Sequence, residues 1–486
     1  MLNNITLSEI FNKEYPFESL PRGTGIVLIG TALTGPARVP IKATDLEQVS
    51  IIFGLNSQLT NAYMEAVTCG ATSDIYLIRV NGEHAQTNIQ NKLILTSLEA
   101  IEEANDLQYE IFTSGDDRYL ALSNNRTGYY SSYYLTGKTI SQLASEINID
   151  AVTMQSPVYA SVLMEGPTSM LIDEYQSEAQ TEGAELGYPK LGYIREIEEI
   201  LASLEDYPIA QIGILCEPFF AKSEDGRLYD KLQEFAQRKA KACAPCIITI
   251  GAEYLVTTDD FVDREVFVFE RAVSFASLLQ TECPVSEFIN IVISGPRFPG
   301  FHPSYRSSGV AAYCGIIDGT SYYEGTTNKA MLTATSDVLS FTDEQRAKLA
   351  ELGYVVTITG TYNGQQQVRI YRGVNLTKST NAVIDPFTPR EPVRYIPSPL
   401  TDIANVKLVQ HIAYRLNDVL DFDELSQIST LRARLEDIMR SESEYIKNYN
   451  ISISETYHGY TKTYVVNIEM VPAGEVGSLV ITMQTR

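Results

Sequence analysis

The chain alternates between short runs of apolar residues and longer stretches in which apolar residues recur every three or four positions. The apolar runs occupy residues 26–30, 75–80, 209–215, 246–250 and 289–293. Runs of consecutive apolar residues are typical of strands in a sheet that is covered on both faces. Helical spacing occupies residues 45–53, 61–69, 228–242 and 308–317. Because helices alternate with buried strands, the pattern predicts a multidomain α/β protein with a mostly parallel sheet.

The pattern changes between residues 93 and 154, where short tyrosine-rich strands are separated by polar turns. Tyr119–Leu122 and Tyr129–Leu135 are two such segments. Short strands at close spacing are typical of an all-β unit. We therefore expect a β-rich subdomain at 93–154, inserted into a central α/β domain that is formed by residues 23–92 and 155–375.

Residues 376–486 have a third pattern. Apolar residues recur with helical spacing from Ile403 to Val419 and again from Ile428 to Ile438, which indicates two amphipathic helices. Three strand-like segments follow, at 451–457, 464–471 and 479–483. The pattern predicts an α+β C-terminal domain with extended terminal strands.

The strands nearest the two ends of the sequence have no evident partner. Ile5 and Leu7 alternate with polar residues in an arm at residues 1–22, and Leu479, Ile481 and Met483 alternate with polar or smaller residues in the last strand. A strand with one apolar face must join some sheet. It either completes a sheet of its own chain or is donated to a neighbouring subunit, where backbone hydrogen bonds and alternate side chains fix the register. These five residues are candidate inter-subunit contacts.

The charge balance narrows the range of partners. The 486 residues include 61 acidic and 37 basic side chains, for a net charge of −24. This charge repels the phosphates of nucleic acid, so we expect protein partners and no direct nucleic-acid contact. The sequence has no run of 18 apolar residues and no signal-peptide pattern, so we expect no membrane insertion and folding in the cytoplasm. Six scattered cysteines indicate reduced thiols.

Motifs for catalysis or cofactor binding are incomplete. The segment 137–139, with sequence GKT, resembles the end of a phosphate-binding loop, but Ser132 stands where that loop requires a glycine. Cys243 and Cys246 have the spacing of a redox dithiol, but they follow a predicted helix, whose dipole disfavours a thiolate. The four histidines lack metalloprotease spacing, and no nucleophile-elbow motif appears. We therefore expect no catalytic residues, no cofactor and no metal.

Several blocks of the sequence, taken in order, resemble the phage tail sheath family. The segment 30–36, GTALTGP, leads to a helix that ends at residues 52–54 and then to the strand at 75–80. The segment 307–312, SSGVAA, is similar to a loop and helix of that family, and residues 466–483 are similar to its closing hairpin. The resemblance spans most of the chain.

The resemblance implies a structural subunit of a contractile tail sheath, and no enzyme. In that family a subtilisin-like central domain lacks catalytic residues, and subunits stack as six-fold rings into a helical polymer that contracts to drive the tail tube through the host envelope. The implied partners are further copies of the chain, the tail tube protein, and baseplate and tail terminator proteins, in a virion assembled in the host cytoplasm. We expect the C-terminal domain to face the tube, and Asn405, Lys407 and Arg415 of one helix to contact it.

Three alternatives stay open. The sheath of a phage-derived bacteriocin or of another contractile injection system would share the fold and the mechanism. A subtilisin-like hydrolase would use the same topology for catalysis. A baseplate or capsid protein would use strand exchange locally.

Overall fold

The computed structural model describes residues 25–486 apart from a set of short gaps. The gaps are residues 81–83, 99–101, 126–127, 154, 177–192, 206, 208, 216–221, 224–225, 242–243, 252–263, 283–287, 302–306, 376–380, 384–393, 397–401, 421–427, 459–460, 473–478 and 485–486. The chain divides into two compact units. Unit 1 comprises Met1–Glu18, Gly30–Thr60 and Ile78–Gly187, and unit 2 comprises Ser19–Ile29, Asn61–Leu77 and Tyr188–Arg486.

The sheet of unit 2 is mostly parallel. Its strands follow the order β17 (Ala330–Met331), β20 (Gln365–Arg372), β19 (Tyr354–Tyr362), β15 (Ile289–Ile293), β14 (Ile247–Gly251), β11 (Gln211–Ile214), β1 (Ile26–Gly30) and β3 (Ile75–Arg79). The short strand β2 (Ile41–Ala43) belongs to unit 1. Neighbours from β19 to β1 are parallel, whereas β20 is antiparallel to β19 and to β17. Every residue of β1, β14 and β15 is buried, as expected for strands covered on both faces.

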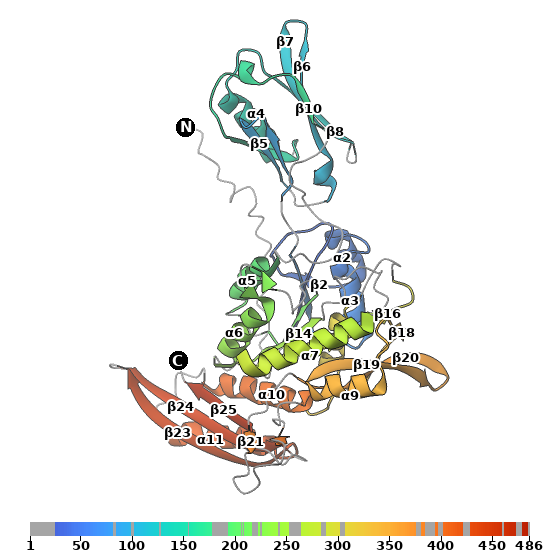
Figure 1. Cartoon of the computed structure of the whole chain (residues 1–486). Helices are drawn as coiled ribbons and strands as arrows, with labels where there is room; N and C mark the ends of the chain where they lie inside the picture. The colour runs from blue at the N-terminus through green and yellow to red at the C-terminus, as the bar shows by residue number, and fades with distance from the viewer. Residues whose placement is uncertain are drawn as a thin grey trace. The chain divides into compact units, whose positions relative to one another are not determined.

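Helices are formed by the segments between the strands of this sheet. They are α3 (Gln58–Thr68), α5 (Tyr193–Ser203), α6 (Leu228–Lys241), α7 (Arg264–Glu282), α8 (Val310–Asp318) and α9 (Asp343–Glu351). α8 contacts β11 and β14, and α6 contacts β14 and β15. α5 lies beside α6 (Figure 1). α8 approaches α3 so closely that a Cβ atom on Gly315 would lie 2.3 Å from the carbonyl oxygen of Ala66. Only glycine fits at this crossing.

Unit 1 contains α2 (Leu46–Phe53) and an antiparallel part at residues 86–176, which we call the β4–β10 subdomain. Its three-stranded sheet has the order β4 (Gln86–Ile89), β5 (Leu93–Ser97), β9 (Val158–Val162), and its four-stranded sheet has the order β10 (Glu174–Gln176), β6 (Leu107–Ser114), β7 (Asp117–Asn124), β8 (Tyr129–Tyr134). Helix α4 (Ile140–Val152) contacts β8 and β9. The subdomain has a core of its own that reaches from Ile89 to Leu171.

The C-terminal part of unit 2 combines two helices with a three-stranded antiparallel sheet. α10 (Ile403–Leu420) packs against α11 (Ile428–Ser441), and the sheet has the order β23 (Ile446–His458), β24 (Thr461–Pro472), β25 (Leu479–Gln484). α11 contacts β23, and α10 contacts β25. Apolar side chains of α11 and β24 are buried in this part, among them Leu431, Leu435, Val466, Ile468 and Met470.

Three two-stranded pairs complete the described elements of unit 2. They are β12 (Lys222–Ser223) with β13 (Gly226–Arg227), β16 (Pro296–Arg297) with β18 (Ser336–Asp337), and β21 (Asn381–Val383) with β22 (Arg394–Ile396).

The structure confirms a mixed α/β protein with several sheets. The strand predicted at 26–30 has those bounds, and the helix predicted at 228–242 is Leu228–Lys241. The core of the β4–β10 subdomain includes Ile89, Val158 and Leu171, which lie on both sides of the expected limits 93 and 154. The division into domains at those limits stays a prediction, and the arm at 1–22 lies outside the described residues.

Candidate assembly site

The last strand pairs with its own chain. Val465–Met470 of β24 pair in antiparallel register with residues 484–479 of β25. In that register the three candidate contact residues stand opposite buried residues of β24: Leu479 opposite Met470, Ile481 opposite Ile468, and Met483 opposite Val466. The described strand thus completes a sheet of its own chain, and its donation to a neighbouring subunit stays a prediction. Ile5 and Leu7 lie outside the described residues.

The three residues expected to contact a tube lie on α10 and have different surroundings. Asn405 and Lys407 are buried, with 7% and 5% of their surfaces exposed. The Lys407 ammonium donates to the carbonyl oxygens of Thr320, at 2.8 Å, and Glu324, at 3.4 Å, in the segment that follows α8. Burial lowers the pKa of Lys407 to about 8, although nearby carboxylates oppose that effect. Lys407 therefore links α10 to the segment after α8 through hydrogen bonds. Contact of this helix with a tube stays a prediction.

Arg415, the third of these residues, belongs to a polar cluster around the buried carboxylate of Glu442. The carboxylate of Glu442 accepts hydrogen bonds from Arg415 and from the Tyr322 hydroxyl, at 3.0 Å, and lies 3.3 Å from Nε2 of His411. We call Tyr322, His411, Arg415 and Glu442 the Glu442 cluster. The rings of Tyr322 and His411 stack with centroids 3.8 Å apart. The cluster joins α10, the end of α11 and the segment after α8.

Electrostatics keep the buried Glu442 ionised. Burial by itself raises the pKa of this carboxyl, because the charged form loses hydration. Hydrogen bonds from Tyr322, His411 and Arg415 stabilise the carboxylate and bring its pKa below the usual value. The cluster is therefore a satisfied ionic contact within the subunit, of the kind whose disruption is costly.

Two solved structures resemble this chain over almost its whole length. The sheath tail protein of Desulfitobacterium hafniense aligns with a TM-score of 0.52 and 12% identity, over 96% of this chain and 98% of that chain. The sheath tail protein of Listeria innocua aligns with a TM-score of 0.52 and 13% identity, over 96% of both chains. The chain has the fold of the tail sheath proteins. Family models and curated protein sequences give no match.

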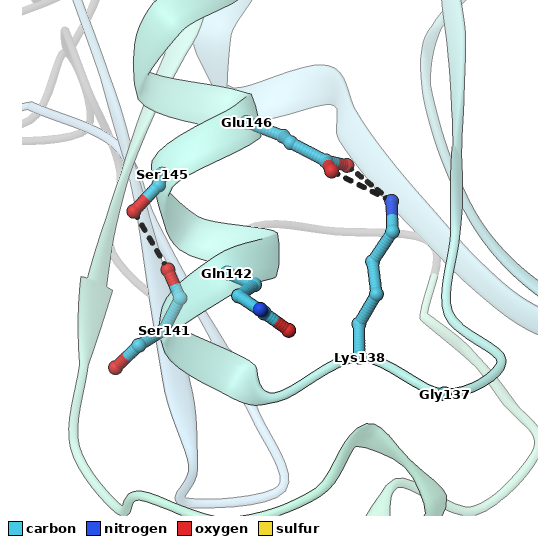
Figure 2. A pocket seen from close by; sticks show the side chains of 6 residues that line it. All are labelled: Gly137, Lys138, Ser141, Gln142, Ser145 and Glu146. Carbon is cyan, nitrogen blue, oxygen red and sulfur yellow. Dashed lines mark hydrogen bonds and ion pairs between the residues drawn. The ribbon is translucent and has the colours of Figure 1, made fainter.

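The GKT segment at 137–139 lies at the start of a helix. Thr139 caps α4 in a capping box with Gln142, and a shallow hollow of about 530 Å³ lies beside it. The Lys138 ammonium binds both carboxylate oxygens of Glu146, at 2.7 and 2.6 Å (Figure 2). This lysine is neutralised by an acidic side chain that lines the same hollow, which disfavours a phosphate there. The segment serves to begin α4.

Two further groups that could be reactive, the thiol of Cys246 and the hydroxyl of Ser294, are buried. Cys246 is fully buried, and burial raises the pKa of its thiol to about 12, so the thiol is unreactive; Cys243 lies outside the described residues. Ser294, just after β15, donates directly to the buried carboxylate of Asp337 at 2.6 Å. Burial raises the pKa of Asp337, although hydrogen bonds from Ser294 and Thr357 act to lower it. A hydrolase triad places a histidine between serine and carboxylate, so this pair has the wrong geometry for an activated nucleophile.

Two kinds of feature are absent from the part of the chain that the structure describes. None of its helices is both long enough and apolar enough to cross a bilayer. It also contains no group of three or more histidine, cysteine, aspartate or glutamate side chains with the arrangement of a metal site.

Sequence reasoning missed the Glu442 cluster. Its members lie at positions 322, 411, 415 and 442, and Tyr322 is 120 residues from Glu442. The nearest signal in the sequence is the i, i+4 pair of His411 and Arg415 on one helix face. That spacing does not reveal an acidic partner on another helix.

Proposed function

We propose that this protein is the structural subunit of the sheath of a contractile phage tail or of a related contractile injection system. The observation that carries the proposal is the sheath fold, which extends over 96% of the chain. Subunits assemble as six-fold rings around a tail tube, in contact with baseplate and terminator proteins, and the particle is built in the host cytoplasm. The protein is not an enzyme, and it needs no cofactor.

Contraction on this proposal uses energy that is stored in the lattice. Subunits assemble in an extended helical arrangement and change together to a contracted one of lower free energy. Contacts that repeat without closing give a helical polymer. The contraction drives the tube through the host envelope, with no nucleotide required.

Terminal strands hold the rings together in this proposal. Ile5 and Leu7 at one end, and Leu479, Ile481 and Met483 at the other, would pair with sheets of neighbouring subunits. Support comes from the antiparallel pairing of β25 with residues 465–470 of β24, because the same backbone hydrogen bonds and alternation of side chains would serve a strand that is donated between subunits.

The central part of unit 2 is proposed to have a subtilisin-like topology without its catalysis. Support comes from the parallel strands β1, β11, β14, β15 and β19 with helices packed on them. Reaction of the purified protein with a fluorophosphonate probe tests this point. We expect no stoichiometric labelling, and labelling of a single serine would favour a hydrolase.

Sedimentation of the purified protein tests the polymer itself. We expect large particles whose amount increases with protein concentration, because a helical polymer grows above a critical concentration. A species that stays monomeric at high concentration would contradict the proposed function.

A further inference from the structure

The four-stranded sheet of the β4–β10 subdomain has two faces of different character. Alternate residues of a strand point to opposite faces, and one face supplies Tyr109, Ile111, Leu120, Leu122 and Tyr133 to the core. The registers of β10, β6, β7 and β8 place twelve residues on the other face. This tyrosine face consists of Gln108, Glu110, Phe112, Ser114, Asp117, Tyr119, Ala121, Ser123, Tyr130, Ser132, Tyr134 and Tyr175.

Large rings lie exposed on the tyrosine face. The exposed fractions of Tyr130, Tyr175 and Tyr134 are 67%, 60% and 39%. Phe112, Tyr119 and Tyr134 are in register on three adjacent strands, and their rings form a row with centroid separations of 5.6 and 5.7 Å. Since the core of the subdomain lies on the other face, the subdomain does not need these exposed rings for its own packing.

Hydrogen bonds hold two of these rings in place. The Tyr134 hydroxyl donates to Asp117 at 2.7 Å, and the Tyr175 hydroxyl donates to Gln108 at 3.1 Å. Rings that are fixed before binding lose little conformational entropy when a partner arrives. Tyrosine and serine together are also the residue types that dominate antibody paratopes, because tyrosine gives a large rigid area and serine adaptable hydrogen bonds.

The charge of the face indicates the chemistry of its partner. No lysine or arginine is among its twelve residues, and the exposed Glu110 forms no ion pair with a described basic side chain. One cation of the subdomain lies beside the face: the ammonium of Lys138 is 5.7 Å from the centroid of the Tyr134 ring. Residues 86–176 contain twelve acidic and four basic side chains. Aromatic rings attract cations, and arginine also stacks on them. The same contact occurs within this chain, where the guanidinium carbon of Arg369 lies 4.0 Å from the ring centroid of Tyr362.

We propose that the tyrosine face docks a partner protein that presents arginine side chains on a basic surface. Guanidinium groups stack on the rings of Tyr130 and Tyr175 and pair with Glu110. A second copy of this chain is a poor occupant, because its net charge of −24 repels an acidic face. The proposal does not depend on the sheath function.

Binding of a model peptide to the full-length protein tests the proposal. The probe is a fluorescein-labelled peptide of alternating arginine and glycine, and its Kd is measured by fluorescence anisotropy at physiological ionic strength. We expect Glu110→Gln, and separately the double variant Tyr130→Ser/Tyr175→Ser, to weaken binding by about tenfold, the size expected for an interface hot spot. Asp150→Asn is the matched control, because it removes one negative charge from the same subdomain at α4; we expect less than about a twofold change there.

Three results would overturn the proposal. The first is equal weakening by Glu110→Gln and Asp150→Asn, which would indicate attraction to charge alone. The second is a lysine–glycine peptide that binds as tightly as the arginine peptide, because lysine lacks the planar group that stacks. The third is no measurable binding to the unmodified protein. Thermal unfolding of each variant verifies folding, and Glu110→Gln changes only an exposed side chain, so it provides the test if the double variant is unstable.

Discussion

The carboxylate of Glu442 accepts a hydrogen bond from the hydroxyl of Tyr322 at 3.0 Å, and 120 residues of chain separate the two. Tyr322 follows α8, which packs on the parallel sheet, and Glu442 directly follows α11. The bond therefore joins the central part of unit 2 to its C-terminal helices. Arg415 and His411 of α10 contact the same carboxylate, so three segments meet at one buried charge.

Replacement of Tyr322 by phenylalanine removes this bond and keeps the ring. We expect the free energy of unfolding to fall by about 2 kcal/mol, because the lost hydrogen bond is to a charged and buried group. Urea denaturation measures the change. Tyr130→Phe, which removes an exposed hydroxyl, serves as the control and should change the stability by less than about 0.5 kcal/mol. Equal effects of the two variants would show that the Glu442 contact contributes nothing specific.

The lowered pKa of Lys407 predicts that the stability of the protein depends on pH. Burial lowers its pKa to about 8 from the ordinary value of 10.5. Between these pH values the unfolded chain binds a proton that the folded chain has released, so the contribution of Lys407 to stability rises with pH. Below about pH 8 the amine is protonated in both states and its contribution is constant.

The comparison with Lys407→Met isolates this effect, because tyrosine and cysteine titrations are common to both proteins. We expect the stability of the wild type to increase by about 1 kcal/mol relative to the variant between pH 7 and pH 9. Urea denaturation at both pH values provides the measurement. If the difference in free energy of unfolding between the two proteins stays constant, or changes in favour of the variant, the result would contradict a lowered pKa for the buried Lys407.

The position of α10 could be predicted from the spacing of its apolar residues, whereas the contacts of its polar residues could not. The spacing of Ile403, Val406 and Val409 predicts the helix, and the sequence alone gives no sign of the surroundings of its polar residues Asn405 and Lys407, whose contact with a tube stays a prediction. In the structure both are buried, and Gln410 is buried too, with its amide donating to the carbonyl oxygens of Ala210 and Pro245. Those carbonyl groups lie 165 residues or more away in the chain. Helical periodicity reports apolar contacts and contains no information on distant backbone acceptors.

Leu143→Ala tests whether the β4–β10 subdomain is held together by its own core. Leu143 is fully buried on α4, so we expect a loss of about 2–5 kcal/mol from the missing methyl groups and the remaining cavity. Hydrogen exchange should accelerate in β5 to β9 and stay unchanged in β14 and β15. Ser145→Ala, an exposed change on the same helix, is the control. Faster exchange in β14 as well would indicate one cooperative core.

The limits of that subdomain were harder to predict than its existence. Tyrosine-rich segments between 93 and 154 identified a β-rich unit, yet Ile89, Val158 and Leu171 share its core. β4 and β9 flank the unit in sequence and pair with β5 on either side. Because short apolar strands also occur in the neighbouring α/β part, local composition does not show which sheet they join.

Removal of residues 478–486 tests the role of the last strand. We expect a folded subunit that no longer forms polymers, because strand exchange between subunits is lost while β23 and β24 keep their mutual pairing. Circular dichroism reports folding, and sedimentation reports assembly. If the truncated protein unfolds instead, β25 acts only within its own sheet, as it does in the register with β24 described here.

Electron microscopy of the concentrated, purified protein tests the sheath proposal most directly. We predict hollow tubes with six-fold rotational symmetry about their axis, because the proposed function requires subunits that stack as six-fold rings. Monomers or closed particles without a helical repeat, at concentrations where the protein stays soluble, would contradict the proposal that this chain works as a helical polymer.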